Sequence, residues 1–192
     1  EWIENKKYPN PPERIKAGLS YTFINHASVL IQTPEINILT DPIYERRASP
    51  VSFAGPLRVR DPGVLYENLP PIDLIVVSHN HYDHMDLPTL KRLSKDHNPV
   101  ILVGLGNKSF LKSNDIERVI ELDWWQSIEL KKTKVFFVPA QHFSARGLFD
   151  RMETLWGGFL IMTPKQERIF FAGDTGYGSH FKKIREKYGD IL

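Results

Sequence analysis

Short apolar runs separated by turns follow a polar start to the chain. Residues 1–20 are polar and rich in proline, which predicts an extended arm over the surface of a domain formed by residues 21–192. Three runs of β-branched and aromatic residues come next: YTFIN at 21–25, SVLIQT at 28–33 and INILTD at 36–41. Such runs are typical of strands. The pattern therefore predicts a meander of three strands.

The middle of the chain begins with a long stretch that has no periodicity. Between Pro42 and Pro71, proline, glycine and arginine accumulate, and a structureless stretch of this length inside a domain is usually functional or mobile. DLIVVS at 73–78 is a continuous apolar run, as expected of a strand buried on both faces. The segments after it predict a helix at 88–95, a buried strand at 100–104 and a helix at 107–114.

The C-terminal part is rich in strands and ends in a helix. Strand-like runs occur at 117–122, 126–130, 133–140, 155–163 and 168–174. Residues 180–189 predict a final helix, and residues 190–192 resemble the start of another strand, so we expect the final strands of the domain to be missing. This order of elements predicts an α/β fold, with two sheets packed face to face and helices outside them.

Composition narrows the class of protein. The 192 residues suit one domain, and a net charge of +2 with scattered basic residues argues against a nucleic-acid partner. The absence of cysteine excludes thiolate ligands and a cysteine nucleophile and is compatible with a cytoplasmic protein. No run approaches the ~20 apolar residues of a membrane span, so any membrane contact is expected to be peripheral. Because the chain does not begin with methionine, we expect a processed or trimmed product, which is compatible with a lost signal sequence.

A group of metal-ligating residue types follows the apolar run at 73–78. The sequence SHNHYDHMD places His79 and His81 two positions apart, where both can point the same way along an extended chain. Asp83 and His84 come at the turn into the predicted helix and can face a second position. This spacing favours two metal ions, and imidazole and carboxylate groups suit zinc, with manganese or iron as chemical alternatives.

Histidines also cluster without binding metal, and a single histidine in a turn is usually solvated or hydrogen-bonded. Four ligand-capable side chains within six positions, directly after a buried strand, are harder to explain in that way. The metal hypothesis is therefore preferred to the purely structural one.

HNHYDH matches the HxHxDH signature of the metallo-β-lactamase superfamily, and the chain resembles that family in two further motifs. PAQHFS contains His142 at the end of a predicted strand, and FFAGDTGY contains Asp174 at the end of another. The resemblance implies a four-layer αβ/βα sandwich and a binuclear zinc hydrolase. The implied ligands are His79, His81 and His142 for the first ion, Asp83 and His84 for the second, and Asp174 for both.

Longer phrases are similar to the branch that contains N-acyl-phosphatidylethanolamine phospholipase D and its bacterial relatives. They include INHASVLIQT, LTDPIYERRASP, LPPIDLIVVSHNHYDHMD and AGDTGYGSHF, and the similarity extends from about Tyr21 to Tyr188. The resemblance implies hydrolysis of phosphodiester bonds in phospholipids of this type. In that family another histidine ligand for the second metal follows the final helix. No such residue occurs here, so we expect a C-terminally truncated fragment with a weakened second site.

The same resemblance implies how the site works. Two metal ions about 3.5 to 4 Å apart lower the pKa of a shared water to roughly 7, which supplies a bridging hydroxide at neutral pH. Asp83 and Asp174 are the expected catalytic residues, because they orient that hydroxide. A lactonase or other small-ester hydrolase uses the same groups and is an alternative. A catalytically impaired fragment is another, and a nuclease is disfavoured by the charge.

Residues outside the metal motif are candidates for binding a small-molecule or phospholipid substrate. The loop between Pro42 and Pro71 combines cations for phosphate with apolar surface for acyl chains, through Tyr44, Arg46, Arg47, Phe53, Arg58 and Arg60. Residues 143–156 offer a second wall, through Phe143, Leu148, Phe149 and Trp156. Loop arginines are often only solvated and aromatic residues are often core, so both assignments stay open.

Three other histidines are expected to lie outside the metal set. His26 follows a predicted strand near the expected site and is interpreted as a supporting or structural residue. His97 is expected in a surface turn. His180 is expected on an exposed face of the final helix, where it cannot replace the absent ligand.

Overall fold

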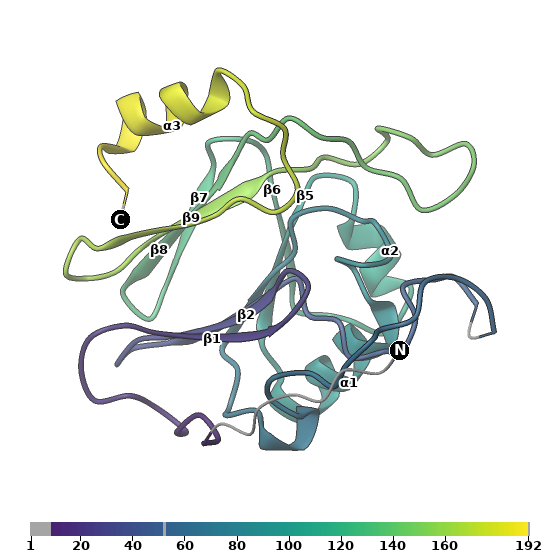
Figure 1. The fold of residues 1–192 in the computed structure, drawn as a ribbon. Coiled ribbons are helices and arrows are strands. Elements are labelled where there is room, and N and C mark those ends of the chain that lie inside the picture. Colours follow the sequence, from purple (N-terminus) through teal and green to yellow (C-terminus); the bar gives the residue numbers. More distant parts are fainter. Residues whose placement is uncertain (1–8, 52, 192) are drawn as a thin grey trace.

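The computed structural model describes residues 9–51 and 53–191 (Figure 1). A six-stranded sheet has the order β1-β2-β3-β4-β5-β6. Its strands are β1 (Ser20–Asn25), β2 (Ser28–Gln32), β3 (Asn37–Thr40), β4 (Leu74–Val76), β5 (Val100–Gly104) and β6 (Val119–Leu122). Strands β1 to β3 pair antiparallel, and β3 to β6 pair parallel. The predicted meander of three strands is confirmed.

A second, four-stranded sheet has the order β10-β9-β8-β7, and all its neighbours are antiparallel. Its strands are β7 (Ser127–Leu130), β8 (Thr133–Val138), β9 (Gly158–Met162) and β10 (Arg168–Phe171). The helices are α1 (Leu87–His97), α2 (Lys108–Lys112) and α3 (His180–Tyr188), with a short 3-10 turn, η1 (Tyr66–Asn68), inside the long loop. Among the described residues, no helix has both the length and the apolar character needed to cross a bilayer.

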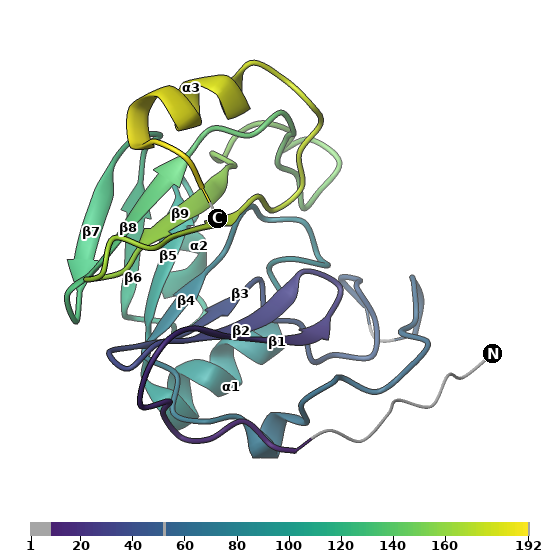
Figure 2. The ribbon, with the colours of Figure 1, turned by 60° about the vertical axis from the view of Figure 1, so that its left-hand side comes forward.

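Three apolar clusters hold the layers together. One joins the first sheet to α1 and α2, with Leu90 packed among residues such as Ile101. The second lies between the two sheets and contains Phe137. The third joins the second sheet to α3, through Phe136 and Ile184. Figure 2 shows the result, with α3 over the second sheet and α1 against the first, so the predicted arrangement of two sheets with helices outside is confirmed.

Strand β4 has no polar residue because both of its faces are buried. The side chain of Ile75 belongs to the cluster under α1 and α2, whereas Leu74 and Val76 belong to the cluster between the sheets. Because successive side chains of a strand point to opposite faces, an internal strand covered on both sides needs apolar residues throughout. This strand leads directly into the histidine motif.

The expected positions of two histidines are wrong. His97 is the last residue of α1 rather than part of a surface turn, and its Nδ1 accepts a hydrogen bond of 3.3 Å from the backbone N–H of Ile72. His180 does begin the final helix, but it is buried, with Nε2 3.1 Å from the hydroxyl of Thr175. His97 is partly buried at the end of α1, and His180 is buried at the start of α3, because each helix end packs against a neighbouring loop.

Some expectations at the ends of the chain are not tested. Residues 190 and 191 form no strand, and Leu192 lies outside the described residues. The first eight residues of the predicted arm also lie outside them. The domain boundaries inferred from the sequence therefore stay predictions.

Packing between the sheets predicts which aromatic side chains hold the fold. Phe137 is fully buried against Phe159, with ring centroids 5.0 Å apart, whereas Phe149 is 93% exposed. We expect Phe137→Ala to lower the free energy of unfolding by about 3–5 kcal/mol, because it empties a closed space. Phe149→Ala should change it by less than about 0.5 kcal/mol. Urea unfolding of both variants measures the difference, and equal losses would contradict the assignment of the core.

Candidate metal centre

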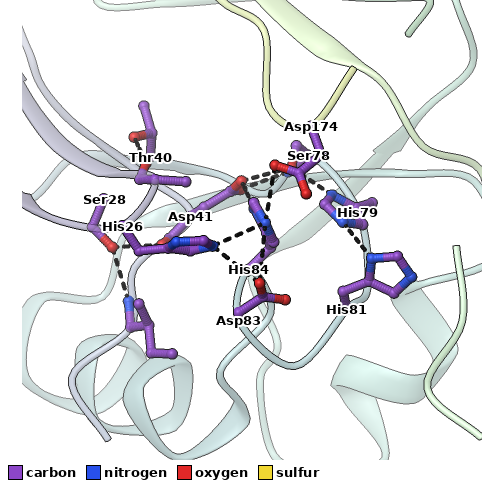
Figure 3. A network of polar contacts seen from close by, with 12 residues as sticks. His26, Ser28, Thr40, Asp41, Ser78, His79, His81, Asp83, His84 and Asp174 are labelled. Atoms are coloured by element: carbon purple, nitrogen blue, oxygen red, sulfur yellow. Dashed lines mark hydrogen bonds and ion pairs between the residues drawn. The ribbon is translucent and has the colours of Figure 1, made fainter. Parts of the chain in front are cut away.

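The predicted metal-ligating side chains come from separate segments and meet at one place. Figure 3 shows His79, His81, Asp83, His84 and Asp174 there. His79, His81, Asp83 and His84 lie on the loop between β4 and α1. Two further segments, which follow β8 and β10, carry His142 and Asp174. The ends of strands from both sheets thus contribute ligand-capable groups to the same place.

The first cluster consists of His79, His81 and His142. The Nε2 atom of His79 lies 2.8 Å from Nδ1 of His81, and Nε2 of His142 lies 3.3 Å from that same Nδ1. One ring nitrogen from each residue lies within 4.8 Å of the other two. Burial and the neighbouring imidazoles lower the pKa of His79 to about 2. Burial lowers the pKa of His81 and of His142 as well. All three rings therefore favour the neutral form, which is the form that binds a metal ion.

The second cluster consists of His26, Asp83 and His84. The Nε2 atom of His26 lies 3.0 Å from Oδ2 of Asp83 and 3.3 Å from Nε2 of His84. Nε2 of His84 is 3.8 Å from the same Asp83 oxygen. The hydrogen bond with His26 is the main cause that lowers the pKa of Asp83, so its carboxylate is ionised.

Asp174 lies between the two clusters. Its Oδ1 is 3.3 Å from Nε2 of His84, and its Oδ2 is 3.8 Å from Nε2 of His142. The residue before it, Gly173, has φ +60° and sits so close to Ser78 that a Cβ would lie 2.5 Å from the Cβ of that serine. Only glycine fits there, and this close approach places one carboxylate oxygen toward each cluster.

A buried carboxylate that the sequence analysis missed orients two of these histidines. Asp41 follows β3, is fully buried and has φ +31°. Its Oδ1 accepts the backbone N–H of Ser78 at 2.7 Å, and its Oδ2 accepts the Ser78 hydroxyl at 2.6 Å. The same Oδ2 lies 2.6 Å from Nδ1 of His84, which must carry the proton. Because Nδ1 is occupied by Asp41, Nε2 is the ring nitrogen of His84 that faces Asp174.

The Ser78 hydroxyl extends this effect to His79. Since it donates to Asp41, it accepts from Nδ1–H of His79 at 2.8 Å, and Nε2 of that ring carries a lone pair toward His81. Outer partners of this kind fix the tautomer of a metal-binding histidine. The signal in the sequence was an aspartate directly after a buried strand, in LTDP. Its role could not be recognised without the neighbouring strand end.

The spacing of both clusters fits a small divalent cation. Zinc bonds to nitrogen and oxygen at about 2.0–2.2 Å in tetrahedral geometry, which places neighbouring ligand atoms roughly 3.3 Å apart. The closest pairs in the two clusters are separated by 2.8 to 3.3 Å and by 3.0 to 3.8 Å. In each cluster, ligand atoms from different segments, namely imidazole nitrogens and in the second also a carboxylate oxygen, lie close enough to share one ion. The donor set therefore suits metal ions, although the individual ligand roles stay predictions.

Arg146 holds the histidine loop in place. Its Nη1 donates to the carbonyl oxygens of Asn80 at 2.9 Å and of Met85 at 2.7 Å, and the guanidinium lies 4.2 Å from the centre of the Tyr82 ring. Asp150 in turn accepts the backbone N–H of Arg146. The segment at 143–156 thus supports the site from outside.

That segment forms only part of the predicted wall. Phe143 contacts the rings of His81 and His142, with centroids 4.8 and 4.9 Å away. Leu148 and Phe149 are more than nine-tenths exposed and line no part of the site. Trp156 packs against Trp124 instead, and its Nε1 donates to a backbone carbonyl. The expectation that all four side chains form one wall is wrong.

A cavity of about 610 Å³ opens beside the second cluster. His26, His81 and Asp83 lie on one side of it, and the long loop between Pro42 and Pro71 forms the other. The loop contributes apolar side chains and three cations, namely Ile43, Ala48, Pro56, Leu57 and Val59 with Arg46, Arg58 and Arg60. A cavity with this lining offers both apolar surface and positive charge next to the metal-ligating groups.

The loop residues divide between structure and cavity. Arg58 donates to the carbonyl oxygens of Ile43 and Glu45, which closes the loop on itself. The side chain of Tyr44 packs on Tyr66 in the core, and Phe53 is 81% exposed, so neither lines the cavity as expected. Arg47 donates to a backbone carbonyl and is also outside the cavity lining.

Comparisons with known proteins agree with this geometry. Residues 36–191 match the model of the beta-lactamase superfamily domain. N-acyl-phosphatidylethanolamine-hydrolyzing phospholipase D 1 of Caenorhabditis elegans is 41% identical over 186 residues, which cover 91% of this chain and 52% of that protein. The mitochondrial N-acyl-phosphatidylethanolamine-hydrolyzing phospholipase D of Saccharomyces cerevisiae is 36% identical over 159 residues, covering 80% of this chain and 34% of that protein.

A solved structure shares the fold. Igni18, a metallo hydrolase from Ignicoccus hospitalis, superposes with a TM-score of 0.64 at 20% identity, covering 88% of this chain and 66% of that one. The chain spans about half the length of the worm enzyme and a third of that of the yeast enzyme. The family match, covering most of the chain, and the two curated relatives lead to one assignment. The chain belongs to the metallo-β-lactamase superfamily, in the branch that contains N-acyl-phosphatidylethanolamine-hydrolysing phospholipase D.

Proposed function

We propose that this chain is a metal-dependent hydrolase of phosphodiester bonds, with phospholipids of the N-acyl-phosphatidylethanolamine type as its substrates. The observation that carries the proposal is the position of Asp174, whose two oxygens face two separate groups of ligand-capable side chains. The cavity beside these groups supports the choice of substrate, because it combines arginines with apolar side chains. The two curated relatives carry the same activity in their names.

The proposed roles follow from the contacts. His79, His81 and His142 would hold one cation, Asp83 and His84 the other, and Asp174 would contact both. A bound pair of divalent cations lowers the pKa of a shared water and polarises a phosphoryl oxygen. Asp83 lies in the second cluster, and Asp174 lies between the two clusters with one oxygen toward each. These two carboxylates would orient the attacking water and accept its proton.

The cavity selects the substrate by charge and apolar contact. The guanidinium groups of Arg46 and Arg60 make no hydrogen bond or ion pair with another described residue, and both line the cavity. They are therefore available to bind phosphate oxygens, whereas Arg58 is used by the loop itself. Leu57 and Val59 offer exposed apolar surface for an acyl chain. A neutral lactone would use the same metal centre without needing these cations.

Binding of metal to the first cluster is the primary test. We expect zinc to raise the melting temperature of metal-free protein by about 5–10 °C at a hundredfold excess over Kd, because such binding stabilises the fold by about 2.7 kcal/mol. His142→Ala should lose most of this shift. His97→Ala, a histidine far along α1, is the control and should keep it. The proposal fails if zinc, manganese and iron all leave the wild-type melting temperature unchanged.

The buried carboxylate of Asp41 yields a second prediction. Asp41→Asn keeps the size of the side chain but removes the acceptor for His84 and Ser78, so the tautomers of His84 and His79 are no longer fixed. Zinc affinity should fall about 10–100-fold, as for other outer partners of metal ligands. Ser78→Ala should weaken it through His79. Asp190→Asn changes an exposed carboxylate and serves as the control. Calorimetric titration measures the zinc affinity. An unchanged affinity in both Asp41→Asn and Ser78→Ala would contradict the proposed role of Asp41.

The charge of the cavity distinguishes phosphodiester from lactone chemistry. The test is the Arg46→Gln, Arg60→Gln double variant, assayed with a nitrophenyl phosphodiester and with N-acyl-phosphatidylethanolamine. For both substrates kcat/KM should fall about 10–100-fold, which is the loss expected when one or two charged hydrogen bonds to the substrate are removed. Turnover of a neutral lactone should be unaffected. Arg185→Gln, on α3, is the matched control. Wild-type protein that cleaves the lactone but no phosphodiester would favour the lactonase alternative instead.

A further inference from the structure

His26 lies where a metal ligand would lie, although the family motif does not include it. It stands in the turn between β1 and β2, and its side chain reaches across to the histidine loop (Figure 3). Nε2 of His26 is 3.0 Å from Asp83 and 3.3 Å from Nε2 of His84. Three ligand atoms, one from each of these residues, lie within 4.8 Å of one another.

The contacts around His26 direct the ligand atoms of three residues at one another. Nδ1 of His84 lies 2.6 Å from Oδ2 of Asp41, so Nε2 is the ring nitrogen of His84 that faces His26. Oδ2 of Asp83 lies 3.0 Å from Nε2 of His26. One nitrogen of His26 therefore faces two other ligand-capable atoms at once. The separations of 3.0 and 3.3 Å are those of neighbouring ligands around one small ion.

The turn that carries His26 is anchored at both ends to the segment that carries Asp41. Asn25 donates through Nδ2 to the carbonyl oxygen of Ile43 at 2.9 Å. On the other side, the Ser28 hydroxyl donates to the carbonyl oxygen of Asp41 at 2.7 Å and accepts from the N–H of Ile43. His26 has φ +40°, a conformation that is uncommon outside glycine, asparagine and aspartate. The turn that presents this ring is thus held by the same segment that orients His84.

We propose that His26 is an imidazole ligand of the second cation, with Asp83, His84 and one oxygen of Asp174. This inference rests on the proposed metal-dependent function and deepens it, since the second site then takes two imidazoles from within this sequence. Oδ1 of Asp174 lies 3.3 Å from the same His84 nitrogen that faces His26. Because His26 also lines the cavity, the ion it binds is directly accessible to a substrate there.

Metal stoichiometry tests the proposal without an activity assay. His26→Asn is the informative variant, because asparagine tolerates positive φ and keeps the turn, but its side chain is too short to reach the ion. Wild-type protein dialysed against cobalt(II) should bind two ions per chain, measured by elemental analysis. In His26→Asn the second ion should bind at least 10–100-fold more weakly, while the first is unaffected. The visible absorption of cobalt should lose the contribution of the second site.

The controls separate this inference from the proposed function. His97→Asn, outside the site, should bind cobalt as the wild type does, and circular dichroism should show that both variants are folded. If His26→Asn binds two ions with wild-type affinity and an unchanged cobalt spectrum, His26 is not a ligand and the inference is overturned. Wild-type protein that binds one ion only would overturn it as well. Wild-type protein that binds no metal would instead refute the metal-dependent function itself.

Discussion

The buried carboxylate of Asp41 is the constraint on which the candidate centre depends. It lies in the interior with no exposure, and such a charge is tolerated only when its oxygens are fully hydrogen-bonded. Here the partners are the backbone and hydroxyl of Ser78 and one ring nitrogen of His84. Burial alone lowers the pKa of His84, but the hydrogen bond and charge of Asp41 outweigh it and raise that pKa. One anion therefore ties two strand ends together and directs two imidazoles at the site.

The position of the site follows from the packing of the two sheets. The first sheet supplies Asp41 and the histidine loop through the ends of β3 and β4, and the second supplies His142 and Asp174 after β8 and β10. The apolar cluster between the sheets sets the distance between these two halves. Gly173 then allows the Asp174 segment to approach Ser78 closely. A loss of packing far from the site would consequently change the spacing of the ligands.

The long loop serves both the fold and the cavity. Arg58 bonds to carbonyl oxygens of the loop itself, whereas Arg46 and Arg60 face the cavity. Sequence alone could not separate these arginines, because they share composition and neighbourhood. The same holds for the second proposed wall, where Phe143 touches the metal-site histidines and Phe149 is exposed. Substrate binding is thus proposed for a smaller set of side chains than the motifs had indicated.

The sequence by itself determined the strand and helix pattern, the sheet layers and the family, because hydrophobic periodicity and the HNHYDH, PAQHFS and AGDTGY motifs are local properties of the chain. It also identified the residue types that meet at the site. Only the tertiary structure decided which oxygen of Asp174 faces which cluster, that Asp41 orients His84, that His26 reaches Asp83 and that His180 is buried. These outcomes depend on contacts between residues far apart in sequence, which no local pattern encodes.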